Sequence, residues 1–138
     1  MNWKNCAIED LKEYESLKTA YQNMREQLKN ARQKKKMLQA VNAAESTDSF
    51  LNSIVEYSLI SENLKLAKRR IKSIEQSLSR LSKEEQYILR AFFMQKQSRT
   101  AELLCEKLSC EQAHVYRKRA EALYKFTLAQ YGNLDVRC

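Results

Sequence analysis

Six polar, aromatic or basic side chains lie close together near the C-terminus: Gln112, His114, Tyr116, Arg117, Lys118 and Arg119. Side chains of these types can pair with base edges in the major groove of DNA or hold its phosphates. On a helix they cannot all face a protein core. We expect the first four to reach base edges, and the last two, together with Arg99, to hold phosphates.

Cys105, Cys110 and His114 raise the question of a zinc site, with four and then three residues between them. A structural zinc site needs four ligands, usually in paired short spacings, and a fourth ligand is missing nearby. Free cysteine is commonly a small core residue. The sequence therefore predicts no metal, and reduced thiols at all four cysteines, including Cys6 and Cys138.

Features that would indicate catalysis are scarce. The chain has one histidine, no glycine-rich phosphate loop and no paired carboxylates in an evident pocket. We expect a protein that is not an enzyme and that uses no cofactor.

The composition predicts an all-α fold. Among 138 residues there is no proline and one glycine, Gly132, whereas hairpins and strand corners depend on both residue types. No apolar run approaches the roughly 20 residues needed to span a bilayer. No apolar segment of a signal peptide follows Met1–Lys4. We expect a cytoplasmic protein without a membrane partner.

The net charge of +8 and the pI of about 9.4 suit a polyanionic partner, whether DNA, RNA or an acidic membrane surface. Residues 1–48, 49–81 and 82–138 carry +2, +3 and +3, so this division shows no single basic segment. The runs Lys34–Lys36 and Lys68–Arg70 are typical of solvated helix faces and could also extend a DNA footprint.

Two long helices are predicted, from Ile8 to Val41 and from Phe50 to Leu81, joined at Asn42–Ser49 with Asp48 or Ser49 as N-cap. Their apolar residues step alternately by three and four, as in heptads. The first series is Tyr14, Leu17, Tyr21, Met24, Leu28, Ala31 and Leu38, interrupted at Lys35. The second is Tyr57, Ile60, Leu64, Ala67, Ile71, Ile74, Leu78 and Leu81. These helices should pair as an antiparallel coiled-coil-like hairpin or pack on a second copy in a homodimer, and both alternatives stay open.

Three shorter helices are predicted after the hairpin. Ser82–Glu85 forms a capping box that begins an apolar helix extending to Met94 and ending at Gln95–Ser98. A helix at Arg99–Leu108, a turn at Ser109–Cys110 and a helix from Glu111 to Tyr131 follow, with Gly132 as the stop. The expected buried residues of the last two helices are Leu103, Leu104 and Leu108, then Val115, Ala122 and Leu123. This order is that of a helix-turn-helix.

The segment Ser82–Phe126 resembles region 4 of bacterial sigma factors. The resemblance rests on Leu81–Glu85, Leu89–Phe93, Leu104–Leu108 and Val115–Leu123. Residues 82–132 also resemble small regulators of the ArpU and RinA kind from phages of Gram-positive bacteria, which share the look of Val115–Ala120 and Leu123–Gly132. The resemblance implies a phage or prophage regulator of transcription in the bacterial host cytoplasm, binding double-stranded DNA alone or together with host RNA polymerase.

The sequence departs from the sigma pattern at three positions. Ser109 stands where glycine is usual, Glu111 where serine or threonine often caps the helix, and Cys105 where alanine is usual. Residues 1–81 lack the aromatic-rich pattern of the polymerase-binding, promoter-melting region of a sigma factor. We therefore expect an accessory regulator with a helical hairpin at 1–81, a helix-turn-helix domain at 82–132 and a tail at 133–138.

A protein-interaction module is the competing hypothesis. A helical adaptor, or a phage inhibitor of a host protein complex, could use the long helices for docking and retain the helix-turn-helix only as a scaffold. A DNA reader should depend on Tyr116, Arg117 and Lys118, whereas an adaptor should depend on the seam at Leu64, Ile71 and Leu78.

Overall fold

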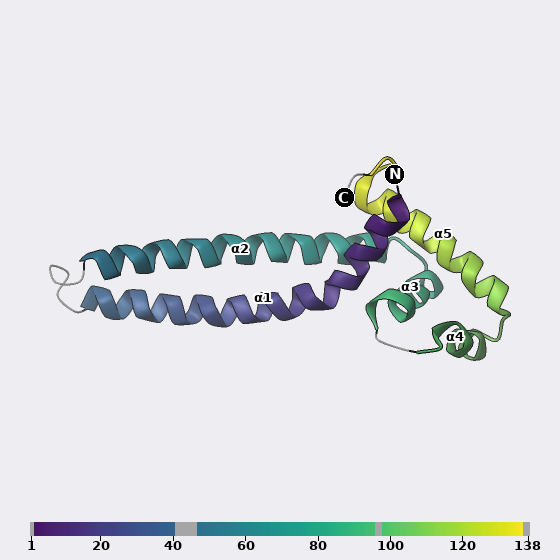
Figure 1. Ribbon diagram of the computed structural model, residues 1–138, viewed down its shortest axis with the longest axis horizontal. Helices are drawn as coiled ribbons and strands as arrows, with labels where there is room; N and C mark the ends of the chain where they lie inside the picture. Colours follow the sequence, from purple (N-terminus) through teal and green to yellow (C-terminus); the bar gives the residue numbers. More distant parts are fainter. Residues whose placement is uncertain (1, 41–46, 96–97, 137–138) are drawn as a thin grey trace. The chain divides into compact units, whose positions relative to one another are not determined.

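The computed structural model describes residues 2–40, 47–95 and 98–136 (Figure 1). All regular secondary structure in these three ranges is helical, which confirms the predicted all-α class. None of the described helices is long and apolar enough to cross a membrane. The helices in chain order are α1 (Trp3–Ala40), α2 (Thr47–Ser79), α3 (Lys83–Leu89), the π-helix η1 (Arg90–Met94), α4 (Thr100–Leu108) and α5 (Gln112–Tyr131).

The two long helices begin earlier than predicted. α1 starts at Trp3 rather than Ile8, and α2 starts at Thr47 rather than Phe50. Asp48 therefore lies in the first turn of α2 instead of capping it, where its carboxylate complements the positive end of the helix dipole. Of the predicted connection, residues 42–46 lie outside the described residues, as does Val41.

The predicted seams are the buried sides of both long helices. In α1 every residue of the series is buried or half-buried, and so is the interrupting Lys35. In α2 all members through Leu78 are buried or half-buried, and Leu81, just beyond the helix, is buried. The residues between successive seam positions are mostly exposed. The 3–4 spacing thus predicted correctly which side of each helix is covered.

Contacts divide the chain into two compact units, residues 17–70 and residues 1–16 with 71–138. This division differs from the predicted boundary at 81/82, because the start of α1 and the end of α2 belong to the same unit as the C-terminal helices. We call the first the paired-helix unit and the second the C-terminal unit.

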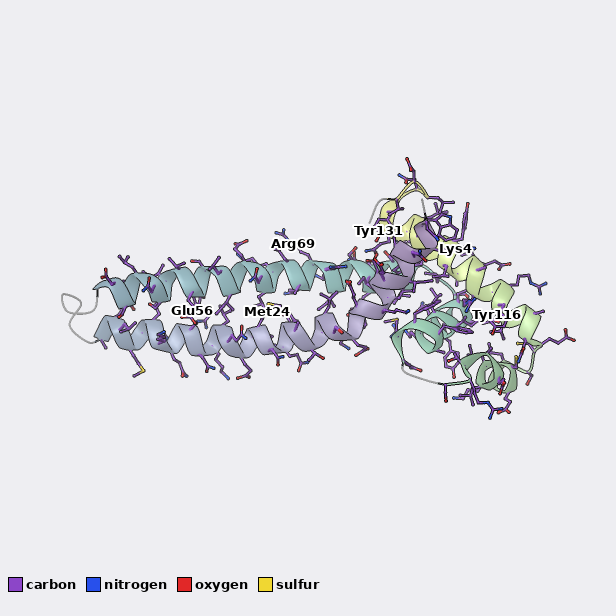
Figure 2. All side chains as sticks on the ribbon, in the orientation of Figure 1. Lys4, Met24, Glu56, Arg69, Tyr116 and Tyr131 are labelled. Atoms are coloured by element: carbon purple, nitrogen blue, oxygen red, sulfur yellow. The ribbon has the colours of Figure 1, made fainter. Side chains whose placement is uncertain are left out.

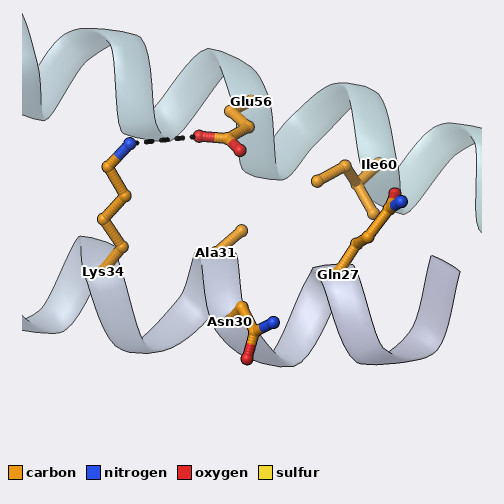
Figure 3. A pocket seen from close by; sticks show the side chains of 6 residues that line it. All are labelled: Gln27, Asn30, Ala31, Lys34, Glu56 and Ile60. Carbon is orange, nitrogen blue, oxygen red and sulfur yellow. Dashed lines mark ion pairs between the residues drawn. The ribbon is translucent and has the colours of Figure 1, made fainter. Parts of the chain in front are cut away.

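In the paired-helix unit, α1 and α2 run side by side in opposite directions (Figure 1). Nη2 of Arg32 donates to the hydroxyl of Tyr57 at 3.4 Å, and Nζ of Lys34 lies 3.6 Å from Oε2 of Glu56. Gln27 and Ala31 lie opposite Ile60, one turn further along α2 (Figure 3). Residues with higher numbers in α1 therefore lie opposite residues with lower numbers in α2, as expected for antiparallel helices.

In the C-terminal unit, the start of α1 packs with α2 and α5. Cys6, Ala7 and Leu11 are buried. The hydroxyl of Tyr131 donates to the carboxylate of Asp10. These contacts explain why α1 begins before Ile8, since its first two turns are held by tertiary packing rather than by the heptad seam.

The end of α2 is joined to α5 by a small polar cluster. Oε1 of Gln130 accepts hydrogen bonds from Ser77 at 2.6 Å and from Ser73 at 3.2 Å. Ser77 is buried beside Ile74 and Leu78, so its hydroxyl needs a partner there. The cluster fixes the rotation of the end of α5 about its axis.

The predicted capping box at Ser82 is present. The hydroxyl of Ser82 accepts from the N–H of Glu85 at 3.2 Å, and Oε1 of Glu85 accepts from the N–H of Ser82 at 3.1 Å. Oε2 of Glu85 also lies 3.0 Å from Nζ of Lys125. Burial disfavours the charged carboxylate, but the Ser82 and Lys125 contacts outweigh burial and lower the pKa of Glu85.

The helix after the capping box does not stay α-helical to Met94. From Arg90 it continues as the π-helix η1, closed by a bond of 2.9 Å from the N–H of Gln95 to the carbonyl of Arg90. The wider turn leaves Ala91 and Met94 buried and Phe92 and Phe93 half-buried. Of the predicted stop at 95–98, Lys96 and Gln97 lie outside the described residues.

One expectation about the cysteines is wrong. Cys6 is disulfide-bonded rather than reduced, whereas Cys105 and Cys110 are free. Within the segment predicted as a tail, Val136 is buried, with 5% of its surface exposed. Cys138 lies outside the described residues.

Replacing Ser82 with alanine should destabilise the C-terminal unit by about 1 kcal/mol, because the capping hydrogen bond to Glu85 is lost. Ser16→Ala is the control. Ser16 is exposed within α1, where alanine is the better helix former, so that variant should be as stable as the parent or slightly more stable. Urea unfolding followed by circular dichroism measures both, and equal stability of the Ser82→Ala variant and the parent would contradict the role of the box.

Tyr14 provides a pH-dependent test. Its hydroxyl donates to Oε1 of Glu75 at 2.7 Å, and burial together with this carboxylate raises the pKa of Tyr14 from 10.0 to about 12. The folded protein favours the neutral phenol, so this contribution is complete below pH 10 and is lost as the pH rises from 10 to 12. Tyr14→Phe should cost about 1 kcal/mol at pH 8, and the gap to the parent should close above pH 10. A gap that stays constant from pH 8 to pH 11 would refute this assignment.

Candidate nucleic-acid interface

A short helix, a tight turn and a longer helix occupy the predicted positions. α4 ends at Leu108, Ser109 adopts a left-handed conformation with φ 52° and ψ 48°, and α5 begins at Gln112. The N–H groups of Ser109 and Cys110 both donate to the carbonyl of Cys105, which closes the end of α4. Serine thus keeps the backbone that glycine usually supplies in this turn, at a steric cost of about 1 kcal/mol.

Four residues from α3, η1, α4 and α5 form the core behind this turn. Val115 is fully buried and packs in one cluster with Ile88, Ala91 and Leu104. Ala122 and Leu123 are also buried, as the spacing predicted. α5 therefore presents one side to the other helices, and the opposite side, which includes Arg117, stays exposed.

One predicted core residue of α4 is wrongly assigned. Leu103 is 46% exposed, whereas Leu104 is buried and Leu108 is half-buried. Neighbouring helical residues point about 100° apart, so a helix this short, which also buries Ala101, cannot turn both leucines inward.

The predicted DNA-contacting residues differ in exposure. Gln112, Tyr116 and Arg117 are exposed, and Tyr116 lies in the half of α5 that follows the turn (Figure 2). His114 and Lys118 are half-buried. The first helical turns of α5 therefore present an amide, a phenol and a guanidinium together.

His114 connects α3 with Arg117. Its Nε2 lies 3.5 Å from Oε1 of Glu84, and its Nδ1 lies 3.1 Å from Nη2 of Arg117. Arg117 can donate to Nδ1 only when that nitrogen carries no proton. The imidazole therefore orients the guanidinium rather than pointing freely outward, and Glu84 becomes part of the site although the sequence indicated it only as a helix start.

Arg119, predicted to hold phosphate, is half-buried and lies against aromatic rings. Its guanidinium carbon is 4.8 Å from the ring centres of both Phe92 and Tyr116, and these two rings are 6.0 Å apart. Such cation–π contacts are worth roughly 0.5–1 kcal/mol each at partly exposed sites. Arg119 therefore links α5 to η1 and packs against the ring of Tyr116.

Two more predicted phosphate contacts have acidic neighbours on their own helices. Nε of Arg99 donates to Oε2 of Glu102 at 2.6 Å, and Nζ of Lys118 lies 3.6 Å from Oε2 of Glu121. Pairs at exposed and half-buried surface positions such as these are weak. Arg99 is the N-cap residue of α4 and adopts a left-handed conformation, with φ 57°.

The cysteines near this site are packing residues. Cys105 and Cys110 contact the cluster around Val115. Burial, with Cys110 and Glu102 nearby, raises the pKa of the Cys105 thiol and so favours its neutral form. Among the described residues no three His, Cys, Asp or Glu side chains group closely enough to hold a metal ion.

Sequence reasoning missed an aromatic groove on the second half of α5. Trp3 packs edge-on against Tyr124, with ring centres 6.1 Å apart, and Nζ of Lys4 lies 5.6 Å from the Trp3 ring centre. Ala120, Glu121 and Lys125 complete the lining of a hollow of about 360 Å³. The groove joins residues 3 and 124, so no local pattern in the sequence could indicate it.

Ser109→Gly should stabilise the C-terminal unit by roughly 0.5–1 kcal/mol, because glycine adopts positive φ without the clash of Cβ. Glu106→Gly in the right-handed interior of α4 is the matched control and should destabilise by a similar amount. Thermal unfolding of the two variants gives opposite shifts if Ser109 is left-handed, and shifts of the same sign would show that the turn has another form.

Comparison with curated proteins and with solved structures found no match. Residues 2–83 match one family, and the matched region ends at the first residue of α3, before η1, α4 and α5. Since the match covers more than half of the 138 residues, the chain belongs to the Uncharacterised protein family (UPF0158).

Proposed function

We propose that this protein is a non-catalytic, DNA-binding regulator of transcription that inserts the first turns of α5 into the major groove. The observation that carries this proposal is the burial of Val115 against Ile88, Ala91 and Leu104, which turns Gln112, Tyr116 and Arg117 outward on one helix after a tight turn.

The roles within the proposed interface follow from the contacts. Gln112, Tyr116 and Arg117 read base edges, with His114 and Glu84 holding the guanidinium in place. Lys118 and Arg99 exchange their carboxylate neighbours for phosphates. Arg119 packs against Tyr116 and Phe92 and so holds the Tyr116 ring in place.

The resemblance of residues 82–132 to sigma region 4 and to ArpU- and RinA-like regulators supports the same proposal. On that basis the protein acts at promoters of a phage or prophage in the cytoplasm of its bacterial host, where host RNA polymerase is a second partner. The family match supports none of this directly, because it covers the preceding helices.

In this proposal α1 and α2 form a coiled-coil-like hairpin, and the hairpins of two copies contact each other in a homodimer. Each hairpin is followed by one helix-turn-helix. Support comes from a second apolar stripe on α2, made of Leu51, Val55, Leu59 and Leu66, which are 52–61% exposed. Their spacing of four, four and seven residues keeps them on one side of the helix, away from the seam that faces α1. A stripe of this kind is suited to contact with another helix.

The same stripe favours one alternative function, a helical adaptor or inhibitor of a host protein complex. In that case the apolar side chains of α2 bind a partner helix and α5 serves only as scaffold. Leu59→Lys with Leu66→Lys would then abolish activity, whereas changes in α5 would not.

Arg117→Ala with Lys118→Ala should weaken binding to the preferred duplex roughly 10- to 100-fold, since one base contact and one phosphate contact are lost. Fluorescence anisotropy with labelled duplexes from upstream of the gene's own operon, at two salt concentrations, measures this change. Arg80→Ala with Lys83→Ala removes the same charge from exposed positions of the same unit and should have little effect.

The proposal is supported if the parent and the Arg80→Ala, Lys83→Ala control bind one fragment selectively and the Arg117→Ala, Lys118→Ala variant does not. If the α5 variant binds and selects as well as the parent, α5 is not a reader, and the adaptor function becomes the better proposal.

A further inference from the structure

The net charge is distributed unequally between the two units. Residues 17–70 contain 11 Lys and Arg against 5 Asp and Glu, a net charge of +6 out of +8 for the whole chain. Between residues 17 and 40 the sequence has seven basic residues and one acidic residue, Glu26. The electrostatic attraction for a polyanion therefore resides mainly in the paired-helix unit and not in the unit that contains α5.

Part of this charge forms a line along α1. Arg25, Lys29, Arg32 and Lys36 are exposed and are spaced by four, three and four residues, which places them on one side of the helix. We call these four residues the basic stripe. The stripe extends roughly 16 Å along the axis at 1.5 Å per residue, a length over which one strand of duplex DNA carries about five phosphates.

The stripe borders a hollow of about 640 Å³. Arg25, Lys29 and Arg32 line it together with Leu28 of α1 and Leu64 of α2, and Glu26 is the acidic side chain on its rim. Gln22 and Asn23 complete the lining with neutral hydrogen-bonding groups. Three cations around one hollow suit phosphate oxygens, which accept several charge-assisted hydrogen bonds.

Nearby contacts show a positive local field. Arg32 donates to the hydroxyl of Tyr57, and this bond, with the charges of Arg32, Lys35 and Lys65, lowers the pKa of that phenol. Lys34, by contrast, is paired with Glu56 on the side of the helix pair shown in Figure 3 and does not belong to the stripe.

The two aromatic rings next to the stripe are half-buried, and each has a cation over one face. Arg25 lies over Tyr21 at 5.9 Å, and Lys35 lies over Tyr57 at 5.1 Å. Binding of single strands relies on open aromatic faces on which bases stack. A line of charges whose neighbouring rings are half-buried and contacted by cations therefore favours a duplex backbone over a single strand.

We propose that the basic stripe of α1 is a second, sequence-independent DNA site that binds the phosphate backbone of duplex DNA. This site goes beyond the proposed reader in α5 and does not depend on it. It supplies much of the salt-dependent affinity for duplex DNA of any sequence.

The test uses the full chain and the charge-removing variant Arg25→Gln, Lys29→Gln, Arg32→Gln. Anisotropy is measured with a labelled duplex of unrelated sequence between 50 and 200 mM salt. Loss of three phosphate contacts should reduce the salt slope by about 2.7, so that over this range the parent's affinity falls roughly 40-fold more than the variant's. Circular dichroism checks that the variant keeps its helices.

Two further variants are the controls. Lys12→Gln, Lys72→Gln, Lys83→Gln removes equal charge from exposed positions of the C-terminal unit and should lower the slope by less than one. Arg25→Lys, Arg32→Lys keeps the charge and should keep the slope.

The outcomes separate this site from the proposed reader. A reduced slope in the stripe variant with an unaffected Arg117→Ala, Lys118→Ala variant supports the stripe and refutes the reader. An unchanged slope in the stripe variant, or equal losses in the stripe variant and the equal-charge control, overturns the stripe whatever α5 does. A parent that binds no duplex at 50 mM salt, or that prefers single strands or anionic vesicles over duplex, also overturns it.

Discussion

The packing of α5 against α3, η1 and α4 is the constraint on which the C-terminal unit depends. Val115, Leu123 and Phe126 are almost completely buried along one side of α5, and burial of such side chains contributes roughly 1.5–3 kcal/mol each. This side of α5 cannot turn outward without losing that energy. The rotation of α5 about its axis, and with it the identity of every exposed side chain, follows from these residues.

The polar contacts around α5 refine that orientation. At one end His114 links Glu84 to Arg117, and at the other Gln130 accepts from Ser73 and Ser77. Between them Lys125 pairs with the capping-box carboxylate of Glu85. A helix held at both ends presents its exposed side chains, among them the guanidinium of Arg117 and the phenol of Tyr116, in a defined direction.

The paired-helix unit is less extensively buried than the C-terminal unit. Its seam positions are mostly half-buried, and its α2 has apolar residues on the outer side as well. A two-helix pair of this kind has little core of its own. Its surface is therefore dominated by charged side chains and by the exposed apolar residues of α2. The two units thus differ in how firmly their exposed side chains are held in place.

The sequence by itself determined the helices, their seams, the capping box at Ser82 and the stop at Gly132, because these depend on residues a few positions apart. It also indicated Val115, Ala122 and Leu123 as core and Arg117 as exposed. Only the tertiary structure decided the early start of α1, the burial of Val136, the inner place of Arg119 and the grouping of charge into one unit. Each of these depends on residues distant in sequence, such as Asp10 and Tyr131, whose contact no local spacing encodes.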